Sequence, residues 1–235
     1  MTGPAGALHG PRMITDGGRL VSVNVGSQRP IDAKSGTSGI DKRPVRGPVA
    51  VEAPGPKGTG GSGLRGDHIS DTANHSGDDQ AVYAYAREDL DAWEVELGRD
   101  LPGGTFGENL TTAGVDVTGA VIGETWEVGS ALLQVSCPRI PCVTFSVHLG
   151  ERRWLPRFTA ARVPGAYLRV LRAGQVRAGD AVRVRDVPAH GVDIGTAFAA
   201  LTTSPELLPL LREVPQLPAE DREALRRRLD DRPSR

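Results

Sequence analysis

The 235-residue sequence has little of several features that would narrow its function at once. Two cysteines are too few for a disulfide-stapled secreted fold. The formal net charge is only −1, from 28 basic and 29 acidic side chains, so neither nucleic acid nor a charged membrane surface is an expected partner. No apolar run approaches the length of a membrane span, and the N-terminus lacks the pattern of a signal peptide. We therefore expect a cytoplasmic protein.

Aromatic residues are also few, at 4% of the chain, whereas 30 glycines and 18 prolines indicate many turns. Such a composition favours short strands over long helices. Residues 58–63 formally fit the G-x-G-x-x-G pattern of dinucleotide-binding loops. Two prolines precede this segment and no helical pattern follows it, and no Gly-Lys-Ser/Thr occurs in the chain. We therefore expect no nucleotide-phosphate loop.

The hydrophobic pattern divides the chain into three parts. Residues 1–19 are glycine-rich and aperiodic, which predicts a disordered extension. Residues 20–190 carry short apolar segments, and the clearest half-buried strand lies at residues 20–25. A helix is expected at 88–97, with Gly98 as its end. Further strands are expected at residues 42–51, 81–85, 115–117, 124–128, 132–136, 167–171 and 181–187.

The pattern becomes helical after Gly191. Ile194, Phe198 and Leu201 recur at helical spacing, Ser204-Pro205 is typical of a helix start, and residues 219–230 form a third helical segment. We expect a small three-helix appendage at residues 191–235. Because the strands before it do not alternate regularly with helices, the fold class is predicted as mainly β with α, an antiparallel or mixed barrel followed by this appendage.

Both cysteines lie in one stretch, residues 136–142, with the sequence Ser-Cys-Pro-Arg-Ile-Pro-Cys. The two prolines stiffen the loop and push the residues before them toward extended conformations. A nearby cation such as Arg139 lowers a cysteine pKa, and the thiolate is both the metal ligand and the nucleophile. The alternative is that Cys142 is a small buried hydrophobic residue, as most free cysteines are.

A polar segment at residues 67–80 invites a metal-binding interpretation. It contains two histidines and four aspartates, namely Asp67, His68, Asp71, His75, Asp78 and Asp79. Their spacing fits neither a tetrahedral zinc site nor an EF-hand loop. We favour a polar loop whose side chains cap its own backbone.

Taken in order, these features resemble the MOSC family, whose domain is named after the C-termini of molybdenum-cofactor sulfurases. The resemblance covers about residues 20–230. It is carried by Gly66-Asp67, by the segments 75–85, 106–110 and 167–171, by Cys-Pro-Arg-Ile-Pro-Cys at 137–142, and by the three-helix tail. It implies a MOSC-type β-barrel that binds a molybdenum cofactor, a pterin carrying the metal.

The resemblance also implies roles for individual residues. Cys142 would be the protein ligand of the metal, and a soft thiolate suits that task. Arg139 would bind either the pterin phosphate or a metal oxo group. His75 would donate a hydrogen bond to an oxo ligand or deliver a proton, a task that Asp79 is also placed to perform. Further cofactor contacts are expected from Asp67, Phe106, Gly107, Glu108, Asn109 and Arg169.

Two departures from the family pattern concern positive charge. Gln80 stands where a lysine is usual, and Ala73 where an arginine is often found. Two cationic contacts to the cofactor phosphate are thus missing or displaced, with Lys57, Arg65 or Arg169 as candidate replacements.

The function implied is reduction of N-hydroxylated small molecules with electrons from a separate redox protein, because no flavin or NAD motif is present. One alternative is a sulfur carrier that holds a persulfide on Cys142 or Cys137. Another is a non-catalytic module that only binds the molybdenum cofactor. The sequence leaves the oligomeric state open, with a homodimer among the options.

Overall fold

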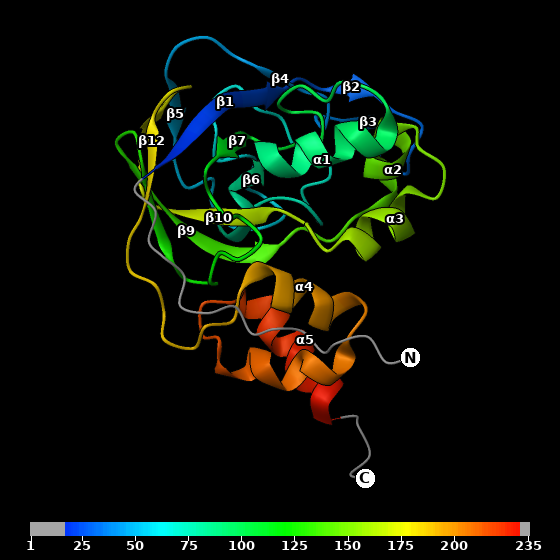
Figure 1. Ribbon diagram of the computed structural model, residues 1–235, viewed down its shortest axis with the longest axis vertical. Coiled ribbons are helices and arrows are strands. Elements are labelled where there is room, and N and C mark those ends of the chain that lie inside the picture. Colours follow the sequence, from blue (N-terminus) through cyan, green and yellow to red (C-terminus); the bar gives the residue numbers. More distant parts are fainter. Residues whose placement is uncertain (1–16, 231–235) are drawn as a thin grey trace.

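The computed structural model describes residues 17–230 and contains a closed barrel of seven strands (Figure 1). The strand order is β12-β8-β9-β10-β6-β7-β1, and β1 pairs with β12 to close it. All neighbours are antiparallel except β6 and β7, which confirms the expected mixed barrel. The strands are β1 (Gly18–Gly26), β6 (Val82–Ala86), β7 (Leu110–Ala113), β8 (Thr125–Val128), β9 (Ala131–Pro138), β10 (Ala166–Arg172) and β12 (Ala181–Val184).

Five short strands lie outside the barrel. β4 (Lys42–Pro44) pairs with the end of β1, and β5 (Val49–Val51) pairs with β11 (Gly174–Val176). The segment expected as one edge strand at 42–51 is thus two strands with different partners. β2 (Arg29–Pro30) and β3 (Thr37–Ser38) form a small hairpin.

Two expectations for the barrel need correction. Residues 1–16 of the expected disordered extension lie outside the described residues, but Gly18 and Arg19 already belong to β1, where they pair with β12. The strand expected at 115–117 is absent, since this segment is an irregular loop whose Val115 and Val117 side chains are buried. The strand in this region is β7. Its buried residues include threonines, whereas the alternating pattern that predicts a strand requires apolar residues at the buried positions.

A second hydrophobic core lies outside the barrel, beneath α1 (Arg87–Leu97), α2 (Val143–Leu149) and α3 (Trp154–Ala161). Strand β6 separates the two cores. Val82 and Ala84 belong to the barrel core, whereas Tyr83 and Tyr85 point into the second core. Because successive strand residues face opposite sides, β6 is buried along its whole length. The second core is mainly aromatic and also contains Trp93, Phe106, Phe145, Trp154 and Phe158.

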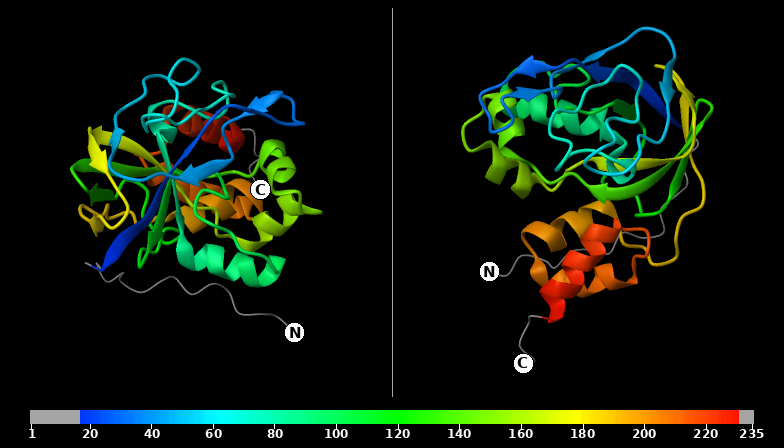
Figure 2. Two further views of the ribbon diagram at one scale, coloured as in Figure 1. Left: turned by 90° about the horizontal axis from the view of Figure 1, so that it is seen from above. Right: turned by 180° about the vertical axis from the view of Figure 1, so that it is seen from behind.

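The C-terminal segment forms α4 (Ile194–Thr202), the 3₁₀ helix η2 (Pro205–Glu213) and α5 (Ala219–Asp230), below the barrel in Figure 1 and in the right view of Figure 2. Buried residues of these helices, among them Ile194, Leu211 and Leu225, belong to the same core as the barrel strands. In residues 17–230 no helix has the length and apolar character needed to cross a membrane.

Arg169 on β10 ties the barrel to the C-terminal helices. Its guanidinium donates hydrogen bonds to the Asp79 carboxylate (Nε to Oδ1, 2.8 Å), to Oε1 of Gln134 (2.9 Å) and to the backbone carbonyl of Gln216 (2.9 Å). Asp79 belongs to the 3₁₀ turn η1 (Asp78–Gln80). One side chain therefore connects η1, strand β9 and the segment between η2 and α5.

We expect Arg169→Lys to lower the Tm by about 3–8 °C, because an ammonium group cannot reproduce the planar fork that reaches three partners. Arg172→Lys is the matched control, since Arg172 is exposed at the end of the same strand. Thermal unfolding of both variants checks this, and equal Tm values would contradict the role given to Arg169.

Candidate functional site

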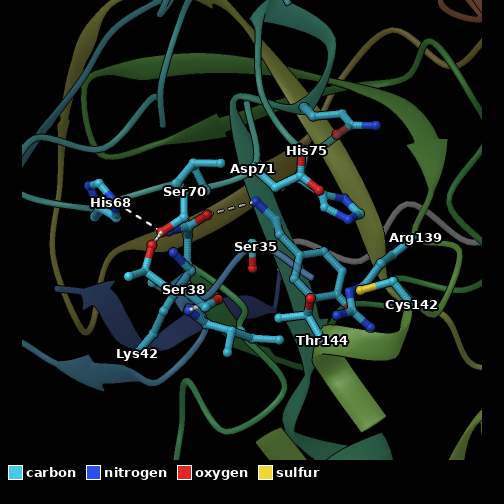
Figure 3. Close-up of a pocket in the computed structure, with 18 of the residues that line it drawn as sticks. Ser35, Ser38, Lys42, His68, Ser70, Asp71, His75, Arg139, Cys142 and Thr144 are labelled. Carbon is cyan, nitrogen blue, oxygen red and sulfur yellow. Dashed lines mark hydrogen bonds between the residues drawn. The ribbon is translucent and has the colours of Figure 1, made fainter. Parts of the chain in front are cut away.

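A pocket of about 680 Å³, measured to its open mouth, lies beside the bend that follows β9. Its wall comes from the β2–β3 hairpin, the loop 68–80, β6, β10 and the segment from β9 into α2. Figure 3 shows His75, Arg139 and Cys142 together on one side of the pocket, with Lys42, Ser38, His68 and Ser70 on the other.

Cys142 is placed by the proline-rich bend. Strand β9 ends at Pro138, and Cys142 has an extended backbone (φ −123°, ψ 168°) directly before α2. Pro141 restricts the backbone before it, so the direction of the sulfur is largely fixed. Cys142 lines the pocket, whereas Cys137 is buried, with 4% of its surface exposed.

The surroundings of Cys142 favour the thiolate. Burial raises the pKa of the thiol, but the hydrogen bond with His75 and the charge of Arg139 outweigh this effect, so the pKa falls from 9.0 to about 7. At Cys137 burial dominates and raises the pKa to about 12. Of the two cysteines, Cys142 is therefore the one that can act as metal ligand or nucleophile near neutral pH.

Arg139 is a buried cation with an unused donor. Its guanidinium carbon lies 3.8 Å from the ring centroid of Phe145 and 5.5 Å from that of Tyr83. The residue is 6% exposed, and among the residues that the structure describes its Nη1 atom has no hydrogen-bond partner. Since Arg139 lines the pocket, this donor is available to a bound oxyanion or oxo group.

A second buried cation, Lys42, lines the opposite wall and was not predicted from the sequence. It pairs with Asp67, whose fully buried carboxylate also accepts from the backbone N–H of Gly26 (2.7 Å) and from Asn109 Nδ2 (2.9 Å). Burial lowers the pKa of Lys42, against the opposing effect of Asp67. Asp67, an expected cofactor contact, thus lies behind the pocket and holds the lysine that lines it.

The turn expected to contact the pterin is mainly structural. Glu108 is fully buried and accepts hydrogen bonds from Gly104 N (2.6 Å), Phe106 N (3.0 Å) and Thr111 Oγ1 (2.9 Å). The ring of Phe106 lies in the aromatic core. Gly107 and Asn109 do line the pocket, but the Asn109 side chain also accepts from Tyr83 N (3.1 Å) and donates to Asp67.

Asp79 and Arg169, expected as a proton donor and a cofactor contact, are not among the pocket residues. They form the ion pair described above, outside the pocket. Of the three residues expected in catalysis, the structure brings Cys142 and His75 together and places Asp79 elsewhere.

The polar loop is organised by its own hydrogen bonds. The Asp71 carboxylate accepts from Asn74 N (3.2 Å), and the Asp71 carbonyl accepts from His75 N (2.9 Å). The Ser76 hydroxyl donates to the Thr72 carbonyl (2.7 Å). Within residues 17–230 no group of three or more His, Cys, Asp or Glu side chains is arranged to hold a metal ion. The hydrogen bonds within the loop support the interpretation that its side chains cap its own backbone.

Several pocket residues were not predicted as site residues. Besides Lys42 they include two tyrosines, an amide and a set of hydroxyls: Tyr83, Tyr167, Gln80, Ser35, Thr37, Ser38, Ser70 and Thr144. The hydroxyls lie in short polar segments without periodicity, so no sequence signal distinguishes them from surface loops. Gln80 could have been singled out from the sequence, because it stands at a position of the family pattern where a lysine is usual.

Comparison with known proteins gives consistent relationships. Residues 71–183 match the MOSC domain model. The chain is 34% identical to the uncharacterized protein YflK of Bacillus subtilis over 162 residues, which cover 68% of this chain and 70% of YflK. A protein of Gibberella moniliformis named "Reductase" is 29% identical over 189 residues, and the chain spans about a third of its length (32%). The crystal structure of YiiM from Geobacillus stearothermophilus superposes with a TM-score of 0.72 at 27% identity, covering 90% of this chain and 99% of that one.

The mixed barrel is thus shared with a protein of known fold. The chain belongs to the MOSC domain family and is a YiiM- and YflK-like member of it.

The thiol chemistry leads to a direct prediction. The alkylation rate of the folded protein without bound cofactor, treated with iodoacetamide, should rise with pH through a midpoint near 7, because the Cys142 thiol is protonated below its pKa of about 7 and reacts only as thiolate. His75→Ala removes the hydrogen bond that favours the thiolate, so the midpoint should move upward. Cys142→Ser should remove the labelling, leaving buried Cys137 unreacted. A midpoint unchanged in His75→Ala would contradict the assignment.

Proposed function

We propose that this protein is a molybdenum-cofactor-dependent reductase that removes oxygen from N-hydroxylated small molecules. The observation that carries the proposal is the Cys142 thiolate, held at the wall of an open pocket between His75 and Arg139. Membership of the MOSC family supports a molybdenum cofactor, and one relative is named a reductase. The N-hydroxylated substrate class comes from the family resemblance.

The residues present fit such a cofactor. Cys142 offers one soft thiolate ligand, and the unpartnered Nη1 of Arg139 offers a charge-assisted donor for an oxo group or a phosphate oxygen. Across the pocket, Lys42 and neighbouring hydroxyls form a polar wall suited to an anionic group. Arg139 thereby provides positive charge in place of the cations missing at positions 73 and 80, whereas the charge of Lys42 is balanced by Asp67.

This arrangement gives separate roles to the cofactor and to the residues around it. The chemistry that the cofactor supplies when bound is removal of the substrate oxygen with two electrons. Cys142 anchors it, and the aromatic core behind Arg139 keeps that guanidinium fixed and shielded from water. His75 adjoins the sulfur, where its imidazole nitrogens can donate or accept a proton. We assign the supply of electrons to a separate redox protein, the kind of partner that the family resemblance implies.

A persulfide carrier is the second candidate, and the low pKa of Cys142 favours it too. The two functions differ in what the purified protein holds. A carrier contains sulfane sulfur that cyanide releases, whereas a reductase contains molybdenum and pterin and consumes an N-hydroxylated compound in the presence of an artificial reductant.

Cys142→Ser should lower the molybdenum content about tenfold or more while the fold is retained, because a serine hydroxyl is nearly isosteric but a poor ligand for a thiophilic metal. Elemental analysis together with thermal unfolding checks this. Cys137→Ser is the matched control and should keep its molybdenum, since Cys137 does not line the pocket. Full molybdenum retention in Cys142→Ser would show that the ligand lies elsewhere.

His75→Ala should lower kcat for an N-hydroxylated substrate by about 100-fold or more and leave molybdenum content nearly unchanged, because general acid catalysis contributes factors of this size. Steady-state kinetics with an artificial reductant, normalised to bound molybdenum, gives the measurement. Equal losses of activity and molybdenum would indicate that His75 binds the cofactor instead.

A further inference from the structure

An exposed apolar stripe lies on α2, next to the wall of the pocket. Ile140, Val143 and Val147 are 43%, 62% and 38% exposed, and the two valines share one side of α2 because they are four residues apart. Val143 stands between Cys142 and Thr144, which both line the pocket. Single exposed valines are common on soluble proteins, whereas apolar residues grouped beside a site are typical of an interaction surface.

The segment that carries this stripe is strongly basic. Residues 138–162, which form the bend, α2 and α3, contain five arginines and one glutamate and so have a net charge of +4, whereas the whole chain has −1. In Figure 1, α2 and α3 lie together at one edge of the molecule. Arg152 and Arg153 are exposed between these two helices, and the single glutamate, Glu151, pairs with Arg157 instead. In the part of the chain that the structure describes, neither Arg152 nor Arg153 has an ion-pair partner.

The backbone of Arg153 favours a role for its side chain. The residue has φ 53° and ψ 35°, a left-handed conformation that glycine adopts more readily. Arg162 is the other non-glycine residue with positive φ in residues 17–230, and its guanidinium donates to the hydroxyls of Thr203 and Ser204. No such bond to the protein explains an arginine at position 153.

An apolar stripe followed by two free cations fits an acidic protein partner. Weak electron-transfer complexes have small interfaces, and charges at the rim of an interface speed association. A second copy of this chain fits less well, because a two-fold contact would bring the same basic segment against itself. Removing the oxygen of an N-hydroxyl group as water consumes two electrons and two protons, so the proposed reaction requires a protein that delivers electrons near Cys142.

We propose that Ile140, Val143, Val147, Arg152 and Arg153, here called the α2 face, dock an acidic electron-carrier protein. This inference rests on the proposed function. In each turnover the partner is oxidised by two electrons, and the two protons come from water. The apolar residues exclude water between the two proteins beside the wall that contains Cys142, and the two arginines attract the carboxylates of the partner.

Flavodoxin, an acidic protein that carries FMN, is the probe for a direct test. Calorimetric titration with oxidised flavodoxin should show binding to the wild type at about 20 mM ionic strength and weaker binding at about 150 mM, because salt screens exposed charges. The double variant Arg152→Glu, Arg153→Glu should bind at least about tenfold more weakly. The matched control is Arg226→Glu, Arg227→Glu, which makes the same change of net charge at exposed arginines of α5 and should bind within about twofold of the wild type.

Turnover and a second variant give independent measurements. With an N-hydroxylated compound as substrate, Arg152→Glu, Arg153→Glu should lower kcat/KM for reduced flavodoxin about tenfold and leave the rate with reduced methyl viologen unchanged, because this small reductant needs no docking surface. Arg153→Gly should weaken flavodoxin binding several-fold without lowering the Tm, because glycine accepts the left-handed backbone.

Three results would overturn the proposal. They are the absence of flavodoxin binding by the wild type, equal losses in the two charge-reversal variants, and a homodimer in sedimentation that Arg152→Glu, Arg153→Glu dissociates, which would assign the α2 face to a second copy. Flavodoxin binding that depends on the α2 face, without reduction of an N-hydroxylated compound by either reductant, would support the docking surface and contradict the reductase. Turnover with methyl viologen without flavodoxin binding would do the reverse.

Discussion

The site depends on how one sulfur atom is held. Cys142 follows a bend stiffened by Pro138 and Pro141, so its direction is set by the backbone. Burial alone would keep its thiol protonated, as it does at Cys137. Contact with His75 and the nearby charge of Arg139 reverse that preference. The thiolate form of Cys142 is therefore favoured at the wall of an open pocket, and the proposed chemistry requires this form.

The two hydrophobic cores explain why a charged site is stable at this place. Strand β6 faces the barrel with small and branched side chains and the second core with Tyr83 and Tyr85. The aromatic core supplies the Phe145 ring on which Arg139 lies, which offsets part of the cost of burying a cation. On the other wall Lys42 pairs with Asp67, which opposes the lowering of the lysine pKa by burial and is itself bonded to Gly26 and Asn109.

The sequence predicted the barrel, the helix at α1 and the pairing of Cys142 with Arg139, because these rest on local periodicity and spacing. It failed at 115–117, where buried valines in an irregular loop mimic a strand, and at β7, where threonines are buried by pairing with distant segments. Asp67, Glu108 and Arg169 were expected at the cofactor, yet they lie outside the pocket lining and bond other protein groups. Tertiary contacts decide whether a polar side chain faces the pocket or the protein interior, and the local sequence pattern does not contain this information. Lys42 and Gln80 reach the pocket for the same reason.

The account stands on the claim that this pocket holds a molybdenum cofactor through Cys142. The most direct test is the molybdenum and pterin content of the wild-type protein, purified from cells that make the cofactor. We predict about one molybdenum and one pterin for each chain, as expected for a single thiolate ligand. Protein that carries neither, while a known molybdenum enzyme from the same cells is fully loaded, would contradict the claim.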